Sequence, residues 1–244
     1  MSVLFISDLH LCEERPATTR AFRAFLAGPA RAARTLYILG DLFEYWVGDD
    51  DGEAPFNRQV SEALAALAAS GVDVFLLAGN RDFLMGERFA RQAGLRLLAD
   101  PTLIELTGRR VLLTHGDTLC TDDRAYQAYR VQVRDAAWQR SFLARPLSER
   151  RHIVEDLRRR SEAAKRDKAS EIMDVNGDAV DALLREWGYP TLIHGHTHRP
   201  ARHLHEVDGR PCERWVLADW DDDAPYLAWG ASGPEAQRYR PPSD

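Results

Sequence analysis

The stretch VLFISDLHL, residues 3–11, combines the two features on which the fold of this chain depends. Its apolar run at 3–7 does not alternate with polar residues, which is typical of a strand buried on both faces of a sheet. Asp8 and His10 follow where that strand ends. Because residues two apart in extended backbone point the same way, we expect both side chains to lie on one face.

Four more short apolar runs continue this pattern along the chain, at 35–40, 73–79, 109–116 and 191–195. Helical periodicity fills the early gaps between them, as in 57–70, which is ended by Gly71. This alternation predicts an α/β fold, of mixed α+β character, in which helices cover a buried and largely parallel or mixed sheet. A length of 244 residues and a hydrophobic content of 45% fit a single domain over 1–244.

Strand patterns dominate the rest of the chain apart from one long helical segment. Turn residues at 107–110 predict a hairpin that joins 102–107 to 109–115. Beyond residue 200, strands are predicted at 201–207, 212–218 and 225–229. We therefore expect a second sheet, or extra antiparallel strands, after the α/β part. Roughly the last twenty residues carry no motif with a predicted role.

The composition indicates a cytoplasmic protein that does not bind nucleic acid indiscriminately. Its net charge is −6, whereas unspecific binding to nucleic acid needs an excess of positive charge. The three cysteines form no CxxC pair, which fits a reducing compartment and no zinc knuckle. The N-terminal apolar run has no basic flank and is too short for a signal peptide. No stretch reaches the ~18 apolar residues of a membrane span.

A basic, helix-rich segment at 121–187 interrupts the alternation of strands and helices. Between residues 124 and 170 it holds 13 Arg and Lys against six Asp and Glu, or +7, so the rest of the chain carries −13. Its apolar residues include Tyr126, Tyr129, Val133, Trp138, Phe142 and Leu143. Such an insertion is either a solvated helical hairpin with a small core of its own, or an amphipathic cap over an anionic and partly apolar ligand.

Five polar clusters stand where the predicted strands end: SDLH (7–10), GDLFE (40–44), GNRD (79–82), THGD (114–117) and HGHTH (194–198). In open α/β sheets, ligands bind at the carboxyl ends of the strands, so the clusters should converge there. The candidate metal ligands in them are Asp8, His10, Asp41, Asn80, His115, His196 and His198.

These seven side chains predict a pair of metal ions. Imidazole together with carboxylate and amide oxygen suits manganese, iron or zinc. Seven ligands are too many for one ion and fit two ions that share a carboxylate, for which Asp41 is the candidate. Two ions ~3.5–4 Å apart promote displacement at phosphorus. Any one cluster alone is weak, since a DxH pair is usually a surface or cap feature and a GD pair a turn. Five clusters in order at five strand ends are specific.

Four further histidines are not assigned to the site. We expect His194 to face away from the metals as a hydrogen-bonding residue. His152, His203 and His205 are interpreted as surface or hydrogen-bonded histidines.

The ordered clusters resemble the signature of the calcineurin-like metallophosphoesterase superfamily, in which D-x-H, G-D, G-N-[HR], H and G-H-x-H follow one another. The resemblance implies a fold of two packed mixed β-sheets flanked by helices. It implies that the first metal is held by Asp8, His10, Asp41 and His198. It implies that the second is held by Asp41, Asn80, His115 and His196.

Longer motifs are similar to those of the UDP-2,3-diacylglucosamine hydrolases of lipid A biosynthesis. They are FISDLHL, GDLFEYWVGDD, LAGNRDFL, THGDTLCTDD, EIMDVN and IHGHTHRP, which together cover most of 1–220. The resemblance implies Mn²⁺-dependent hydrolysis of the substrate's pyrophosphate to UMP and 2,3-diacylglucosamine 1-phosphate. It implies a peripheral location at the cytoplasmic face of the inner membrane, and we expect a monomer.

The same resemblance implies roles for individual residues. Arg81 and His196 are the expected catalytic residues. The expected substrate contacts are Asn80, Arg81, Asp123, Ser161, Lys165, Lys168 and His196. Lys165 departs from the asparagine usual in that family, although lysine keeps a hydrogen-bond donor there.

Together with the phosphate leaving group that the resemblance implies, Arg81 is the best single-residue hint that the bond cleaved is an anhydride. A histidine after the asparagine would protonate an alkoxide leaving group. A phosphate ester has a second pKa of ~6 and leaves as an anion without that proton. A permanently charged guanidinium with two donors in one plane then stabilises the departing phosphate better than an acidic side chain would. The alternatives are a phosphatase, nuclease or cyclic-nucleotide phosphodiesterase of the same fold, a non-catalytic scaffold of that fold, or a nucleic-acid-binding module that uses only the basic segment.

Overall fold

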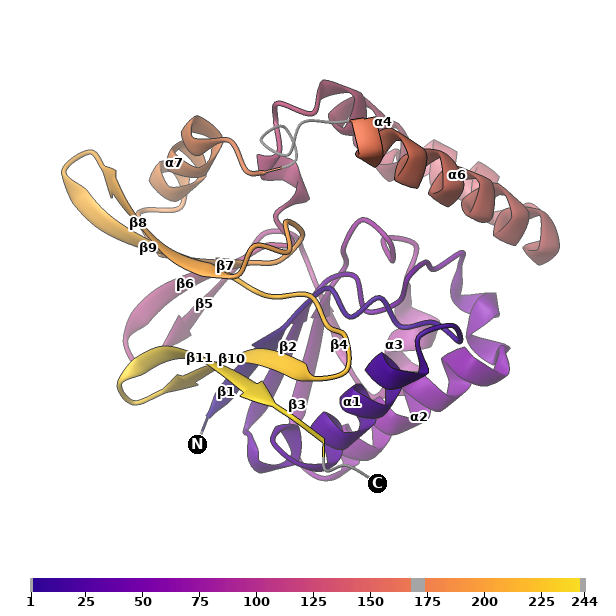
Figure 1. The fold of residues 1–244 in the computed structure, drawn as a ribbon, viewed down its shortest axis with the longest axis horizontal. Coiled ribbons are helices and arrows are strands. Elements are labelled where there is room, and N and C mark those ends of the chain that lie inside the picture. The colour runs from indigo at the N-terminus through magenta and orange to yellow at the C-terminus, as the bar shows by residue number, and fades with distance from the viewer. Residues whose placement is uncertain (1, 168–173, 242–244) are drawn as a thin grey trace.

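The computed structural model describes residues 2–167 and 174–241, with side chains left out from 160 to 167. Two β-sheets are packed face to face, and helices cover their outer faces (Figure 1). The strands of the first sheet are β1 (Val3–Ile6), β2 (Thr35–Leu39), β3 (Asp73–Leu77), β4 (Arg96–Leu98), β10 (Ala224–Gly230) and β11 (Gly233–Tyr239). Those of the second are β5 (Thr102–Leu106), β6 (Arg109–Leu113), β7 (Thr191–His194), β8 (Ala201–Val207) and β9 (Arg210–Val216).

The first sheet has the order β11-β10-β1-β2-β3-β4. Strands β1 to β4 run parallel, and β10 and β11 add antiparallel strands at one edge. The second sheet has the order β5-β6-β7-β9-β8, with a parallel centre and an antiparallel strand at each edge. The carboxyl ends of the parallel strands of both sheets therefore open toward one region of the molecule.

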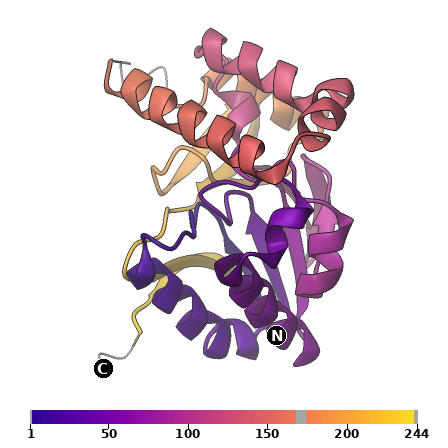
Figure 2. The same cartoon turned by 90° about the vertical axis from the view of Figure 1, so that its right-hand side faces the viewer.

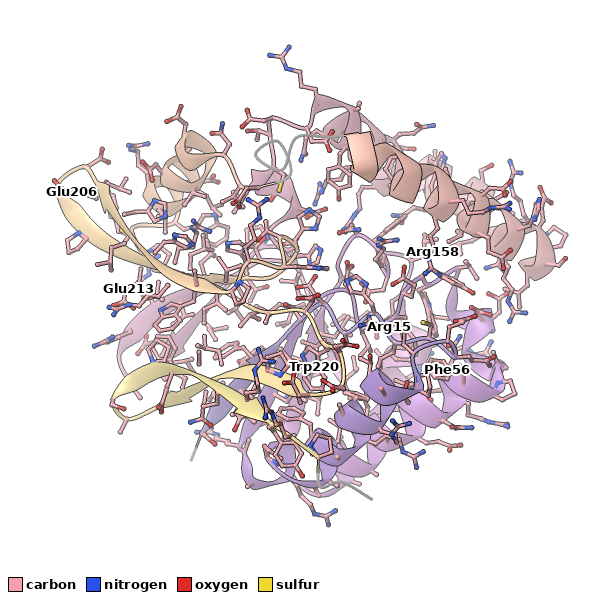
Figure 3. The ribbon with its side chains drawn as sticks, viewed as in Figure 1. Arg15, Phe56, Arg158, Glu206, Glu213 and Trp220 are labelled. Carbon is pink, nitrogen blue, oxygen red and sulfur yellow. The ribbon has the colours of Figure 1, made fainter. Side chains whose placement is uncertain are left out.

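Three helices pack on the outer face of the first sheet: α1 (Pro16–Ala27), α2 (Pro55–Ala69) and α3 (Glu87–Ala93). Alternate residues of each strand face them, so Leu36 and Ile38 of β2 join the helical core while Tyr37 and Leu39 face the second sheet. This double burial explains the continuous apolar runs. Trp220, labelled in Figure 3, is fully buried and meets Phe25 edge-on at 5.3 Å between ring centroids.

The remaining helices follow β6. A short 3-10 turn leads into α4 (Arg124–Arg134), α5 (Ala136–Leu143), α6 (Leu147–Asp167) and α7 (Gly177–Glu186). Helix α7 packs on the outer face of the second sheet through Val180 and Leu184. The other three stand apart from the sheets, and α6 crosses above the loops that follow the strands (Figures 1 and 2). Arg151 anchors α6 to the body, with its Nε 2.9 Å from Asp51.

The predicted fold class is confirmed, and all five strands with polar clusters form as predicted. The hairpin at 102–115 and the strands after residue 200 are also present. The later strands divide, because β8 and β9 extend the second sheet while β10 returns to the first. The sequence reading missed β4 and β11. The first has only three residues, and the second is a largely exposed edge strand without an apolar pattern.

Candidate metal centre

Each predicted ligand lies two to four residues beyond the last residue of a parallel strand. Three strands of the first sheet and two of the second deliver them, so the cluster bridges the open ends of both sheets. Asp8, Asp41 and His115 are almost fully buried, and His10 is 7% exposed. All seven side chains therefore lie in one region, as expected from the rule that ligands bind at the carboxyl ends of parallel strands.

The local backbone at these residues differs from the extended conformation assumed for the DxH and HxH pairs. Both residues of each pair have positive φ angles, as does Asp41: the values are 55° for Asp8, 49° for His10, 54° for Asp41, 68° for His196 and 55° for His198. Residues other than glycine rarely occupy this region, at a cost of about 1–3 kcal/mol each. Asp8 and His10 do reach one group of ligands, as expected, but the extended backbone assumed for them, and likewise for His196 and His198, was wrong, because each pair follows the end of its strand with positive φ angles.

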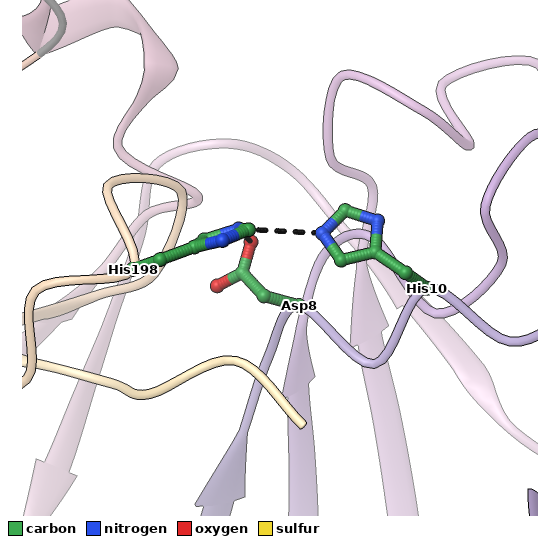
Figure 4. Close-up of side chains that lie close together, drawn as sticks. All are labelled: Asp8, His10 and His198. Carbon is green, nitrogen blue, oxygen red and sulfur yellow. Dashed lines mark hydrogen bonds and ion pairs between the residues drawn. The ribbon is translucent and has the colours of Figure 1, made fainter. Parts of the chain in front are cut away.

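The first group of ligands is formed by Asp8, His10 and His198 (Figure 4). His10 Nε2 and His198 Nε2 lie 3.3 Å apart, and His198 Nε2 lies 3.3 Å from Asp8 Oδ1. The other oxygen of Asp8 accepts hydrogen bonds from Ser7 Oγ at 2.5 Å and from the backbone N–H of His196 at 2.9 Å. One carboxylate oxygen is thus fixed by the protein, while the other faces the imidazoles.

The second group of ligands surrounds Asn80 Oδ1. This oxygen lies 2.9 Å from His115 Nε2 and 2.8 Å from His196 Nδ1. Asp41 stands between the two groups, with one oxygen 3.7 Å from His115 Nε2 and the other 3.9 Å from His10 Nε2. That position fits a carboxylate shared by two ions.

Two glycines permit the close approach of these loops. A Cβ at Gly79 would collide with the Asp41 carboxylate, and one at Gly195 would collide with Ser7 and with the Asp8 carboxylate. Because the obstructing atoms belong to the candidate ligands, no side chain larger than hydrogen fits at either position.

Burial and mutual charge shape the protonation of the cluster. Burial disfavours the charged form of Asp8, yet a hydrogen bond with His198 and the charge of His115 hold its pKa well below the usual range. Burial likewise opposes a charge on His115, but Asp41 and Asp8 raise its pKa to about 9. The cluster therefore keeps a proton on His115 to balance its carboxylates. A bound cation would supply that balance and release the proton.

The donor set fits a pair of divalent cations. Asp8 Oδ1 is buried, and its neighbour His198 Nε2, at 3.3 Å, does not meet it with the geometry of a full hydrogen bond. An incompletely paired carboxylate oxygen is costly to bury, and a bound cation would remove that cost. The imidazole nitrogens of His10 and His198 face each other without an intervening group. Mixed nitrogen and oxygen donors suit ions such as Mn²⁺, Fe²⁺ or Zn²⁺.

A cavity of about 500 Å³ opens on this cluster. One side of it is polar and includes His10, Asp41, Asn80, Arg81, His196 and His198. The other side is apolar and includes Trp46, Phe83, Leu84, Tyr129, Trp138, Phe142, Val154 and Leu157. Trp138 and Phe142 stack with ring centroids 5.0 Å apart, which makes a flat aromatic wall. Helices α4 to α6 supply most of the apolar lining, and the strand-end loops supply the polar one.

Helix α4 is attached to the metal-ligand loops. Tyr126 lies against the His196 ring at 5.8 Å between centroids, and its hydroxyl donates to Asp117 at 2.7 Å. Arg130 Nε also donates to Asp117, which is fully buried. Arg134 donates to the carbonyl of Gly79 at 2.9 Å. These contacts set the position of the helix over the centre.

Sequence reasoning missed several residues that support the centre, although they lie inside the polar clusters. Asp82 accepts from the backbone N–H of Leu42 at 2.8 Å and of Gly79 at 2.6 Å, so it ties two ligand loops together. Glu44 lies 3.3 Å from His10 Nδ1. Their acidic character and their place next to ligands were the available signals, but their partners lie far away in sequence.

Four of the seven predicted substrate contacts line the cavity, and the side chains of the other three lie outside the described residues. Asn80, Arg81, Asp123 and His196 line the cavity. Asp123 also caps α4 by accepting from the backbone N–H of Tyr126. The side chains of Ser161 and Lys165, and Lys168 as a whole, lie outside the described residues.

Two of the unassigned histidines, His194 and His205, belong to a chain of contacts that is buried at His194 and becomes exposed at Asp181. His194 is fully buried, and its Nε2 lies 3.1 Å from Arg214 Nη1. Arg214 Nε donates to His205 Nε2 at 3.1 Å, and His205 Nδ1 lies 3.1 Å from Asp181. His194 and His205 are thus hydrogen-bonded histidines, as the sequence indicated, whereas the side chain of His152 is 71% exposed.

No helix among the described residues combines the length and hydropathy that crossing a membrane requires.

Comparisons with known proteins agree with this geometry. The profile of the calcineurin-like phosphoesterase family matches residues 1–200. A protein of Aromatoleum aromaticum named UDP-2,3-diacylglucosamine hydrolase is 67% identical over 234 residues, which cover 96% of this chain and 95% of the relative. A protein of the same name from Cellvibrio japonicus is 50% identical, covering 96% and 97%. One from Escherichia coli is 51% identical, covering 90% and 91%.

Proposed function

The chain belongs to the calcineurin-like phosphoesterase family, and we propose that it hydrolyses the pyrophosphate bond of UDP-2,3-diacylglucosamine. The products are UMP and 2,3-diacylglucosamine 1-phosphate. One observation carries the proposal: a single cavity joins the histidine and carboxylate cluster to an aromatic and aliphatic wall. A phosphatase acting on small water-soluble substrates has no use for such a wall. A nuclease could stack bases on its aromatic rings but has no use for its aliphatic side chains, whereas an acylated UDP-sugar needs the polar and the apolar lining together.

The proposed cofactor is a pair of divalent ions, most simply Mn²⁺. Asp8, His10, Asp41 and His198 would hold one ion, and Asp41, Asn80, His115 and His196 the other. When bound, two such ions activate water and neutralise phosphoryl oxygens. The protein's part is to keep the ligands at fixed positions, which the buried hydrogen bonds to Asp8 and Asp41 accomplish.

Arg81 is the proposed catalytic cation. Its backbone N–H donates to Asp41 at 2.8 Å and its carbonyl accepts from Trp46 at 2.9 Å, so the residue is held at the edge of the metal cluster. Arg81 lines the part of the cavity where a pyrophosphate would lie, and its side chain is 19% exposed. Charge grows on the departing phosphate as the bond breaks, and a fixed two-donor cation stabilises it. His196 and Asn80 are the proposed neighbours of the phosphoryl oxygens.

The aromatic wall is the proposed binding site of the acyl chains. Each methylene moved from water onto apolar surface contributes about 0.8 kcal/mol, so a few methylenes against Trp138 and Phe142 stabilise the complex considerably. Ser161, Lys165 and Lys168, together with Asp123, are proposed to contact the rest of the substrate. In this arrangement, the basic segment at 121–187 acts as a cap over a ligand that is anionic at one end and apolar at the other.

The same helices are proposed to rest on the cytoplasmic face of the inner membrane, with the protein acting as a monomer. Exposed basic residues on these helices are Arg124 on α4, Arg140 on α5 and Arg159 on α6, and Arg145 is exposed in the turn between α5 and α6. Val131, also on α4, is 71% exposed. Each basic residue near an anionic surface contributes ~1 kcal/mol, so several together hold a protein there reversibly.

Product analysis tests the function directly. The protein is incubated with Mn²⁺ and UDP-2,3-diacylglucosamine in detergent micelles, with the unacylated UDP-sugar as the comparison substrate. We expect UMP from the acylated substrate and much less from the unacylated one. In ¹⁸O-labelled water, attack on the uridine-proximal phosphorus places the label in UMP. Release of UDP, or label in the lipid phosphate, would contradict the proposed reaction.

The same assay separates the alternatives. Faster turnover of a phosphomonoester or of single-stranded DNA would favour a phosphatase or a nuclease, and no turnover of any phosphoester would favour a scaffold. Binding to duplex DNA that weakens steeply with salt would favour a nucleic-acid-binding module.

A further inference from the structure

Glu44, the last residue of the GDLFE cluster, lies behind the cavity lining, where its carboxylate contacts the lining residues His10 and Arg81. Its backbone N–H donates to the carbonyl of Leu11 at 3.1 Å, which holds the loop after β2 against the loop after β1. The residue is 8% exposed. A buried carboxylate needs partners, and those of Glu44 come from three separate segments.

One oxygen of Glu44 lies 3.3 Å from His10 Nδ1. A carboxylate behind one ring nitrogen keeps a proton there and leaves the other nitrogen free to bind a metal. His10 Nε2 accordingly faces Asp41 and His198. His10 Nδ1 is buried and has no hydrogen-bond partner among the described residues, and the Glu44 oxygen 3.3 Å away is the group placed to favour the tautomer that a metal ligand requires.

The other oxygen of Glu44 lies between two guanidinium groups. Arg81 Nη1 is 3.5 Å away, and Arg158 Nε of α6 is 3.1 Å away. Figure 3 shows Arg158 between α6 and the loops that follow the strands. Two cations that share one carboxylate can lie close together without strong repulsion. Glu44 therefore sets where Arg81 stands and links its position to that of α6.

We propose that Glu44 is a positioning residue that couples three parts of the enzyme: the metal ligand His10, the cation Arg81 and the cap helix α6. The guanidinium groups of Arg81 and Arg158, 3.5 and 3.1 Å from one of its oxygens, balance the charge of this buried carboxylate. The part that concerns Arg81 rests on the proposed function. The part that concerns His10 needs no substrate to be measured.

Substitution of Glu44 by Gln keeps the shape of the side chain and removes its charge. We expect Mn²⁺, added to the metal-free protein and followed by calorimetry, to bind one site 10- to 100-fold more weakly, a typical cost of losing such a partner. We expect kcat to fall at saturating Mn²⁺ while KM stays the same or falls, because freed guanidinium groups still attract the phosphates. Glu44→Asp should recover part of both losses, and Glu62→Gln on the exposed face of α2 serves as the matched control.

Arg158→Met tests the link to α6 without touching the metal ligands. It should leave Mn²⁺ affinity at the wild-type value, and its effect on kcat should largely disappear when Glu44 is already Gln, because coupled residues are not additive. Wild-type Mn²⁺ affinity and kcat in Glu44→Gln would overturn the proposal, as would additive effects in the double variant. Weaker Mn²⁺ binding in Glu44→Gln is expected even if UDP-2,3-diacylglucosamine proves not to be the substrate. Failure of the proposed function can therefore be distinguished from failure of this proposal.

Discussion

Replacement of Arg81 tests whether the leaving group departs as an anion. The backbone hydrogen bonds of Arg81 to Asp41 and Trp46 do not involve its side chain, so a substitution leaves the ligand loop in place. Loss of one group that stabilises transition-state charge costs about 2.7–4 kcal/mol. We therefore expect Arg81→Ala to lower kcat by roughly 10²- to 10³-fold, with Mn²⁺ affinity unchanged.

Two further substitutions at this position separate charge, geometry and acidity. Arg81→Lys keeps the charge and loses the planar pair of donors, so kcat should remain roughly tenfold or more below wild type, the cost of one charge-assisted hydrogen bond. Arg81→His introduces an acid. If the leaving phosphate needs no proton, the histidine variant should be no better than the lysine variant at any pH.

The assay is UMP release from the acylated substrate in detergent, with kcat and KM determined separately between pH 5.5 and 8.5. An Arg81→His variant that matches wild type below about pH 6.5, where imidazole is protonated, would refute the reasoning. A rise in KM alone in Arg81→Ala would make the residue a binding group only.

Three other perturbations have defined outcomes. Asp41→Ala should abolish turnover and reduce the Mn²⁺ bound per chain from two, as counted by metal analysis; unchanged stoichiometry and rate would exclude a shared ligand. Trp138→Ala should raise KM for the acylated substrate roughly tenfold, since ~50 Å² of lost apolar contact is worth ~1.3 kcal/mol, while KM for the unacylated UDP-sugar stays constant. Burial and Arg214 lower the pKa of His194 from 6.5 to about 3, so the unfolded chain binds the extra proton between these values. His194 should therefore lower the free energy of unfolding of the metal-free protein by up to ~1.4 kcal/mol per pH unit from pH 6.5 downward. When this free energy is measured by urea denaturation at several pH values, its slope against pH should be shallower by that amount in His194→Gln than in the wild type.

Much of the fold could be predicted because its signals are local. A strand buried on both faces needs an unbroken apolar run. The five runs here are short and followed by polar residues, and four of them end in glycine. β11 could not be predicted in the same way, because an exposed edge strand is stabilised by its backbone pairing with β10 and not by an apolar pattern. The positive φ angles at Asp8 and His10 left no signal either, since only the packing of the surrounding loops maintains them.

The types of ligand and their order along the chain were determined by the sequence, because ligand chemistry belongs to single side chains and strand ends are encoded within a few residues. Tertiary structure alone decided which residues support those ligands. Glu44 faces His10 across a neighbouring loop and meets Arg158 from a helix more than a hundred residues later. Tyr126 likewise reaches His196 only because α4 is bound to Asp117. Such contacts depend on how two sheets and a helical segment pack together, and no local pattern of residues records that arrangement.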